Sequence, residues 1–225
     1  MFCGVTLQAK GKEMSKKGLF YTGFFVVLAV AFYFILVGLI PGFDKKGVAP
    51  IGFIRPFAFT NQDGEKVTEK NVAGKVYVAE YFFTTCPGIC KEMNENMRIV
   101  YDAFRKEKDF LILSHTCDPD TDSVQQLKKY AEKLNVDTDQ WIFLTGRKDS
   151  LYNMARVSYT IDDPNDNLVS MEDDFMHSQL WALVDRNGDV RKIYDGLKEA
   201  EVRQLVKDAR RLLKEQEREA KTENK

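Results

Sequence analysis

The apolar stretch KVYVAEYFF at residues 75–83 and the segment TTCPGIC at residues 84–90 decide the fold. A run of this length and composition is typical of a strand that is buried on both faces of a sheet. The segment after it contains a Pro-Gly pair, and apolar side chains then recur at helical spacing, at Met93, Met97, Val100 and Phe104. The pattern predicts a strand that leads into a helix, with two cysteines at the junction.

Strands and helices alternate along the rest of the chain. An Asp-Gly turn joins two short predicted strands at residues 57–60 and 65–67, and a turn at residues 185–189 joins strands at 179–184 and 190–194. Further strands are predicted at 110–114 and 141–144, and helices after Pro87 and at 122–134, 150–157 and 198–216. This order predicts an α/β protein with a mixed sheet that helices cover on both faces.

The composition excludes several classes of protein. The chain has 225 residues, of which 44% are hydrophobic and 30% charged, so it is not a disordered protein. Its mean hydropathy of -0.36 excludes a polytopic membrane protein. The 33 basic and 34 acidic residues nearly cancel, so no overall charge attracts nucleic acid. Four cysteines are too few for a disulfide-rich scaffold but enough for one reactive pair.

Residues 19–40 (LFYTGFFVVLAVAFYFILVGLI) contain no charge and no proline. A helix of this length can cross a hydrocarbon core of about 30 Å. A buried core helix would be expected to have a polar face. A cleaved signal peptide would have a shorter apolar region and a small-residue cleavage site. The sequence therefore favours one uncleaved transmembrane anchor.

The anchor divides the chain into five predicted segments. They are an N-terminal segment (1–18), the anchor (19–40), a linker (41–53), a folded domain (54–214) and a charged tail (215–225). Four lysines precede the anchor and two follow it closely, which places the N-terminus in the cytoplasm. A start at Met14 would leave two lysines on each side. The absence of an Arg-rich, Ser-rich transit segment favours a bacterial inner membrane, with the folded domain in the periplasm.

Cys86 and Cys90 are the candidate reactive residues. With Pro87 as the first helical residue, Cys86 is expected near the N-cap and Cys90 one turn later on the same face. The helix dipole would then lower the thiol pKa values and favour thiolates. Such a pair can form a disulfide, exchange with another disulfide or bind a soft metal ion. The alternative is a pair of structural cysteines.

The spacing of the two cysteines bears on the choice between redox chemistry and metal binding. Thioredoxin-type redox pairs are separated by two residues, whereas three separate Cys86 from Cys90, which leaves more room for a metal ion. Structural zinc requires four protein ligands, and the sequence has no second cysteine pair. His177, in a predicted loop before a strand, is the candidate third ligand, with a surface histidine as the alternative. Two thiolates suit Cu(I), and an added imidazole suits Cu(II) as well.

Three other residues could belong to the site or lie apart from it. His115 ends a predicted strand at the sheet edge where sites in α/β proteins gather, but it could equally be a structural histidine. Cys117 could be a buried small residue, a resolving thiol or an auxiliary metal ligand, and burial is the favoured interpretation. Cys3 carries no predicted function.

Four segments, in order, make the sequence resemble the SCO/SenC family of thioredoxin-fold copper proteins. They are residues 81–90 (YFFTTCPGIC), 114–122 (SHTCDPDTD) with LKKYA at 127–131, 141–146 (WIFLTG), and 176–178 (MHS) with WALVD at 181–185. Members of this family take part in the assembly of cytochrome c oxidase, and one N-terminal span commonly tethers them. The resemblance implies a thioredoxin-like mixed sheet flanked by helices.

The resemblance also implies a site and a function. It implies that Cys86, Cys90 and His177 bind copper, as Cu(I) or Cu(II), and that Asp118 supports the site. The implied partner is an oxidase subunit that accepts the copper. The alternative is a thiol–disulfide oxidoreductase that uses Cys86 and Cys90 to reduce the partner's cysteines before metallation.

Two residues depart from the family pattern. Lys91 stands where proline is frequent, which leaves the ligands intact. Cys117 stands where a small apolar residue is usual, and its thiol could take part in redox chemistry beside the Cys86–Cys90 pair.

Overall fold

The computed structural model describes residues 16–39, 50–161 and 179–223, and the chain divides into two units, Met1–Val48 and Ala49–Lys225. The first unit contains helix α1 (Lys16–Leu39), whose large apolar side chains are exposed, with Phe20 and Val27 about 70% accessible (71% and 69%). Within the described ranges, no helix has both the length and the apolar character of a membrane span. The transmembrane anchor expected at residues 19–40 is therefore not confirmed.

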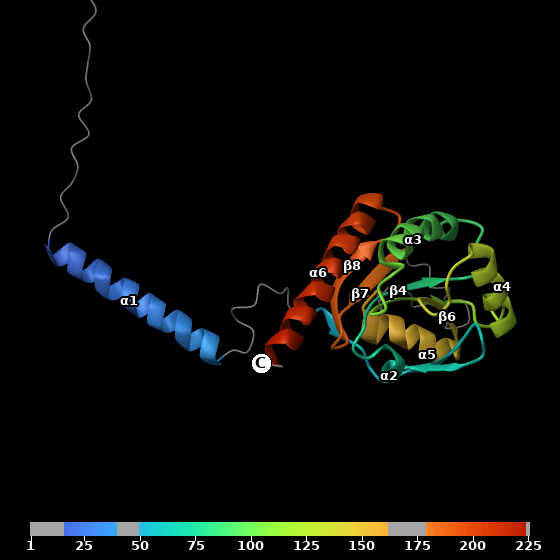
Figure 1. Ribbon diagram of the computed structural model, residues 1–225, viewed down its shortest axis with the longest axis horizontal. Coiled ribbons are helices and arrows are strands. Elements are labelled where there is room, and N and C mark those ends of the chain that lie inside the picture. The colour runs from blue at the N-terminus through green and yellow to red at the C-terminus, as the bar shows by residue number, and fades with distance from the viewer. Residues whose placement is uncertain (1–15, 40–49, 162–178, 224–225) are drawn as a thin grey trace, which may run out of the picture. The chain divides into compact units, whose positions relative to one another are not determined.

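The second unit is built on one eight-stranded mixed sheet with the strand order β1-β8-β7-β4-β5-β6-β2-β3 (Figure 1). The strands are β1 (Gly52–Phe53), β2 (Ala58–Asn61), β3 (Lys66–Thr68), β4 (Val76–Phe82), β5 (Phe110–Thr116), β6 (Trp141–Thr145), β7 (Leu180–Val184) and β8 (Asp189–Asp195). The neighbours β4, β5 and β6 run parallel, and the remaining pairs are antiparallel. The predicted mixed sheet and both predicted hairpins are confirmed.

Strand β4 lies at the centre of the sheet, and all seven of its residues are buried. Its side chains alternate between the two faces, as a pleated strand requires. Phe82 stacks on Tyr130 of helix α4 (Val124–Leu134) with ring centroids 5.2 Å apart. The hydroxyl of Tyr81 donates to the carbonyl of Leu151 in helix α5 (Lys148–Asn153). Both faces of the strand are therefore covered by helices, which explains its continuous apolar sequence.

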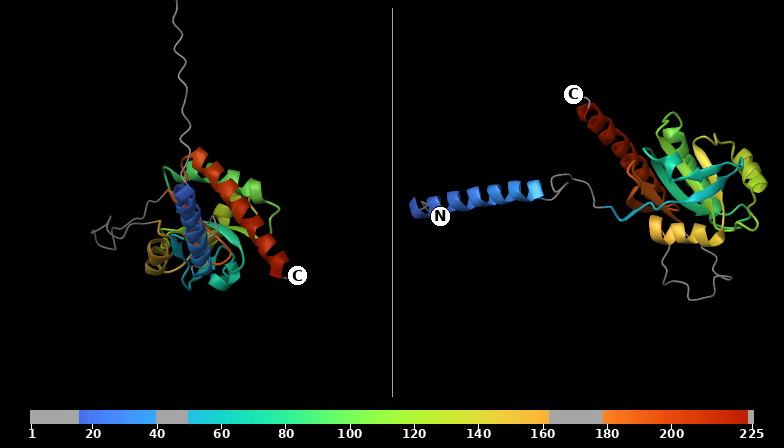
Figure 2. Two further views of the ribbon diagram at one scale, coloured as in Figure 1. Left: turned by 90° about the vertical axis from the view of Figure 1, so that its left-hand side faces the viewer. Right: turned by 90° about the horizontal axis from the view of Figure 1, so that it is seen from below.

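Helices complete the two outer layers. They are α2 (Glu69–Val72), α3 (Cys90–Phe104), α4 (Val124–Leu134), α5 (Lys148–Asn153), the π-helix η1 (Met154–Tyr159) and α6 (Glu199–Glu223). In Figure 2, right, α5 lies on one side of the sheet and α3 with α6 on the other. The apolar stripe predicted for α3 is buried, since Met93, Met97, Val100 and Phe104 are at most 2% exposed.

The structure differs from the predicted elements in several places. Strand β1 lies inside the stretch expected as a linker and pairs with β8. The helix predicted at 150–157 is a short α-helix that continues as η1. It ends at Thr160, whose left-handed backbone (φ 55°) lets its N–H bond to the Ala155 carbonyl. Short propensity patterns do not distinguish α from π hydrogen bonding, so this change could not be predicted from the sequence.

Candidate functional site

Cys86 and Cys90 lie just beyond the carboxyl end of β4, but only Cys90 is helical. Helix α3 begins at Cys90, with Ile89 as its N-cap residue, and residues 86–89 form an irregular turn. The expected helix start at Pro87 is therefore wrong by three residues. Proline disfavours helical backbone at the residue before it, and a following glycine favours a turn. Cys86 is thus held by the turn, where its N–H bonds to the Phe83 carbonyl at 3.3 Å.

The two thiols lie in different surroundings. Cys86 is half-buried, whereas Cys90 is buried, and both are free thiols. Burial raises the pKa of Cys90 to about 12, and hydrogen bonding to the Cys86 thiol and the nearby Glu80 carboxyl contribute in the same direction. The prediction that the helix dipole would favour a Cys90 thiolate is therefore wrong for the metal-free, reduced state, because desolvation outweighs the dipole. A metal ion that binds the Cys90 sulfur must displace this proton.

The predicted third ligand, His177, lies outside the described residues. Within the described ranges, no group of three or more histidine, cysteine or acidic side chains is arranged to hold a metal ion. The structure thus brings together two of the three predicted ligands, Cys86 and Cys90. Their sulfur atoms are the donor type that Cu(I) prefers, so this half of the site fits a soft metal cargo.

Cys117 packs in the core beside the cysteine pair. It is 2% exposed, its Sγ donates to the Phe82 carbonyl at 3.2 Å, and burial raises its pKa. These contacts support the favoured interpretation of Cys117 as a buried small residue. Asp118 organises its own loop, where its Oδ1 accepts from the Thr121 N–H at 3.4 Å and its carbonyl accepts from the Asp122 N–H.

Asp122 is a buried acid that the sequence analysis quoted as the last residue of the segment at 114–122 without assigning it a role. It is fully buried and accepts hydrogen bonds from the N–H and hydroxyl of Thr84 and from the hydroxyl of Thr116. The sequence pattern placed it at the start of a helix, where an aspartate is usually a solvent-exposed cap. Ser123 provides that cap instead, accepting from the Gln126 N–H. Asp122 therefore joins the loop before Cys86 to the end of β5.

Glu80 is a second buried acid that the sequence analysis missed. It lies on central strand β4, 1% exposed, and Ser114 of β5 donates to its carboxyl at 2.6 Å. Burial raises its pKa to about 8, partly offset by that hydrogen bond. The only sign of Glu80 in the sequence is an acidic residue among aromatic ones. That pattern does not indicate which face of the strand its side chain occupies.

His115 belongs to the opposite face of the sheet from Glu80. It is fully buried and stacks on Tyr81 with ring centroids 5.1 Å apart, while Phe59 and Tyr159 meet it edge-on. Its Nε2 lies 3.5 Å from the Tyr159 hydroxyl. Burial lowers its pKa to about 4, so it is neutral at physiological pH. The structure therefore supports the structural interpretation of His115.

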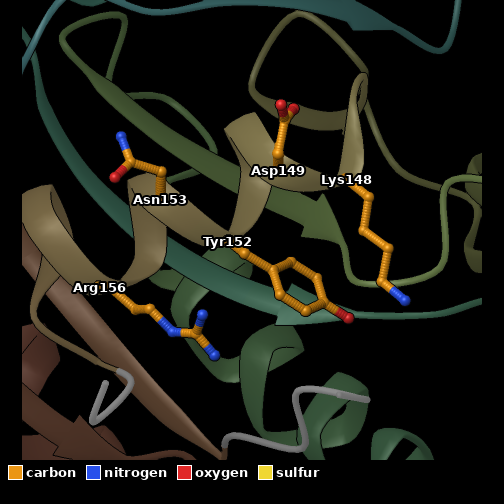
Figure 3. A pocket seen from close by; sticks show the side chains of 5 residues that line it. All are labelled: Lys148, Asp149, Tyr152, Asn153 and Arg156. Atoms are coloured by element: carbon orange, nitrogen blue, oxygen red, sulfur yellow. The ribbon is translucent and has the colours of Figure 1, made fainter. Parts of the chain in front are cut away.

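A pocket of about 430 Å³ lies along α5 and η1 (Figure 3). Its lining residues are Lys148, Asp149, Tyr152, Asn153 and Arg156. The Tyr152 ring has Lys148 Nζ 5.5 Å and Arg156 Cζ 5.7 Å from its centroid, and its hydroxyl donates to the Cys117 carbonyl at 3.0 Å. In Figure 3 the side chains of Lys148, Tyr152 and Arg156 point to the same side of the helix, and that of Asp149 points away. A basic, aromatic surface thus adjoins the strand end that carries Cys117.

Comparison with known proteins identifies the family. The SCO1/SenC family model matches residues 47–214, which is most of the chain and includes Cys86, Cys90 and His177. The chain belongs to the SCO1/SenC family. The SCO1 protein homolog of Bacillus subtilis is 32% identical over 161 residues, which cover 70% of this chain and 81% of the relative.

Solved structures of SCO proteins share the fold. A SCO1/SenC family lipoprotein from Bacillus anthracis is 31% identical with a TM-score of 0.63, covering 74% of this chain and 99% of the other. BsSco, described by its disulfide switch and as a member of the Sco family of cytochrome c oxidase assembly proteins, is 30% identical with a TM-score of 0.58, covering 73% and 98%. Arabidopsis thaliana ScoI, solved with copper bound, is 27% identical with a TM-score of 0.56, covering 72% and 99%. The thioredoxin-like SCO fold expected from the sequence is confirmed.

Proposed function

We propose that this SCO protein carries one copper ion, bound by Cys86, Cys90 and His177, and delivers it to a subunit of a respiratory oxidase during assembly. The observation that carries the proposal is the pair of neighbouring free thiols at the end of β4, one half-buried and one buried. Two soft sulfur donors at the end of a central strand form a site for Cu(I), and the imidazole of His177 would extend it to Cu(II). The copper-bound Arabidopsis relative supports the same cargo.

The different burial of the two thiols determines the order in which the recipient's ligands replace them. Cys86 is accessible to an incoming ligand of the recipient, whereas Cys90 is enclosed by the core. A ligand exchange would therefore replace Cys86 first and Cys90 last. Because Cys90 is protonated without metal, loading releases its proton and release of the ion restores it, so a low pH favours delivery.

The experiment is an anaerobic Cu(I) titration of the reduced full chain in detergent. We expect one copper per wild-type chain, no tight binding by Cys86→Ser, and weakened binding by His177→Ala. Cys117→Ala is the matched control, because it removes a thiol that is not assigned to the site, and its stoichiometry should equal that of the wild type. A reduced wild-type chain that fails to bind copper stoichiometrically would refute the proposal.

A second function is supported by the contact between the two thiols and by the disulfide switch named for BsSco. In this function Cys86 and Cys90 give two electrons and two protons to a partner's disulfide, forming their own disulfide and leaving the partner with two thiols. It does not require His177. If His177→Ala reduces a partner disulfide at the wild-type rate while the wild type binds copper weakly, the oxidoreductase function is favoured.

The proposal also includes a membrane location. The uncharged stretch at 19–40, the exposed apolar side chains of α1 and the lipoprotein relative from Bacillus anthracis support a chain held at an inner membrane with its folded domain in the periplasm. Labelling of Cys86 in intact cells tests this orientation. A thiol reagent that does not cross the inner membrane should reach Cys86 once the outer barrier is permeabilised. Labelling only after lysis of the inner membrane would contradict it.

A further inference from the structure

Asp122 is a buried carboxyl group whose hydrogen bonds all come from neutral donors. It accepts from the Thr84 N–H at 3.1 Å, from the Thr84 hydroxyl and from the Thr116 hydroxyl at 2.6 Å. Within the described ranges, no lysine or arginine side chain forms an ion pair with it. Such an arrangement costs desolvation energy, which hydrogen bonds to the carboxylate must offset.

The partners of Asp122 connect three elements around the cysteine pair. Thr84 lies two residues before Cys86, Thr116 is the last residue of β5, and Asp122 itself precedes helix α4. Gln126, in the first turn of α4, donates to the Thr84 hydroxyl at 3.2 Å. That hydroxyl thus donates to one residue and accepts from another, which fixes its rotamer. The segment that leads to Cys86 is therefore tied to both β5 and α4.

Cys86 depends on this attachment more than Cys90 does. Cys90 is held by its helix and by the surrounding core, whereas Cys86 lies in an irregular turn and is half-buried. The backbone hydrogen bond of Cys86 itself, to Phe83, is long at 3.3 Å. The position of Cys86 therefore depends on the segment that enters the turn, which Asp122 holds through Thr84.

We propose that Asp122 is a positioning residue for Cys86. Its hydrogen bonds to Thr84 set how readily Cys86 and Cys90 bind one metal ion together or form a disulfide with each other. The inference rests on the proposed function only in taking this pair as the working one. A pair held at short range has a high effective concentration, which favours both a shared metal ion and the intramolecular disulfide. Loosening the turn lowers that concentration without touching either sulfur.

The test is the equilibrium of the pair with glutathione, measured on the full chain without copper. One oxidised glutathione takes two electrons and two protons from Cys86 and Cys90, giving one protein disulfide and two reduced glutathione molecules. Asp122→Asn keeps the shape but places an amide NH2 among groups that all donate. We expect its equilibrium constant for disulfide formation to fall roughly tenfold or more.

A matched control separates positioning from general loss of stability. Asp185 is also buried and accepts from the N–H groups of Asn187 and Asp189 and from Arg191, in the turn between β7 and β8 at the other end of the sheet. Asp185→Asn should lower the melting temperature yet leave the glutathione equilibrium within about twofold of wild type. A fall in melting temperature for Asp122→Asn with an unchanged equilibrium would overturn the proposal.

A second pair of variants keeps the test decisive if Asp122→Asn does not fold. Thr84→Val removes the hydroxyl that Asp122 and Gln126 share, and Thr84→Ser retains it. The valine variant should shift the equilibrium and the serine variant should restore it; equal values for both would overturn the proposal. Since copper is absent, a wild type that binds no copper refutes the proposed function and leaves this result valid.

Discussion

The Ser114 hydroxyl donates to Glu80 Oε1 at 2.6 Å across the paired strands β4 and β5, where the two residues are in register. Ser114 in turn accepts from the indole N–H of Trp141 at 2.8 Å. Both donors, the Ser114 hydroxyl and the Trp141 indole N–H, are uncharged, and Glu80 is 1% exposed. A carboxyl group so enclosed keeps its proton at a pH where it would be ionised in the unfolded chain, and its pKa rises to about 8.

We expect Glu80 to make the folded domain less stable as the pH rises. The unfolded chain loses this proton near pH 4.5 and the folded chain near pH 8, so the folded state binds more protons between these values. The free energy of unfolding therefore falls through this window, by up to about 5 kcal/mol in total. Urea unfolding at pH 6.5 and 8.5 measures the upper part of the fall. In Glu80→Gln, whose side chain stays neutral, the free energy of unfolding should fall less between these two pH values. A fall equal to that of the wild type would contradict the assignment of this pH dependence to Glu80.

His115 should have the opposite effect in acid. Its pKa falls from 6.5 to about 4 on burial, so the unfolded chain binds more protons than the folded chain between these values. The stability that His115 contributes is complete above about pH 6.5 and is lost as the pH falls toward 4, by about 3 kcal/mol. His115→Phe keeps an aromatic ring between Tyr81 and Tyr159 without the titrating group. Because Glu80 titrates with the opposite sign in this range, both proteins compared carry Glu80→Gln. From pH 7 to pH 4.5 the unfolding free energy of the Glu80→Gln/His115→Phe protein should change less than that of Glu80→Gln alone, and an equal slope would exclude His115 as the cause.

Most of the fold could be predicted because the sheet obeys simple periodicity. The run at residues 75–83 is apolar because β4 is covered on both faces, and the stripe from Met93 to Phe104 is apolar because α3 has one buried face. Strand β1 could not be predicted, since its two residues contain no pattern of their own and are ordered by pairing with Val190 and Asp189 of β8. A two-residue strand is specified by its partner and not by its own sequence.

We expect alkylation to modify Cys86 well before Cys90. Cys86 is half-buried in a turn, whereas Cys90 is 6% exposed and burial raises its pKa to about 12. The thiolate is the reactive form, so both exposure and protonation slow Cys90. Brief treatment of the reduced native chain with iodoacetamide, followed by peptide mass spectrometry, should find Cys86 modified at least tenfold faster. Cys117, buried and hydrogen-bonded to Phe82, is the internal control and should remain unmodified, whereas equal labelling of Cys86 and Cys90 would contradict the assigned burial.

The candidate site could be predicted only as far as sequence spacing reaches. Cys86 and Cys90 are four residues apart, so their proximity follows from local geometry. Asp122 is 38 residues from Thr84, and only the parallel alignment of β4 with β5 brings the two together. The desolvation of Cys90 could not be predicted from nearby residues either, because its raised pKa depends on the whole core around it. The helix dipole could be inferred from the sequence, but the burial that outweighs it could not.

Gly196 gives a test of how β7, β8 and α3 fit together. Its N–H donates to the Gln179 carbonyl at 2.8 Å, and its own carbonyl accepts from Asn96 of α3 at 2.8 Å. A Cβ at this position would overlap the indole ring of Trp181, which is fully buried. Because both hydrogen bonds fix the backbone, Gly196→Ala cannot relieve the overlap by a small shift and should lower the free energy of unfolding by about 3 kcal/mol.

Urea unfolding followed by tryptophan fluorescence measures this loss, since Trp181 lies at the point of overlap. Gly88→Ala is the matched control, because a Cβ at Gly88 has no atom within 4 Å, and its stability should stay within about 0.5 kcal/mol of wild type. A Gly196→Ala protein as stable as the control would mean that the indole ring can move aside. The close packing of Trp181 against the β8–α6 turn would then not be a fixed part of the fold.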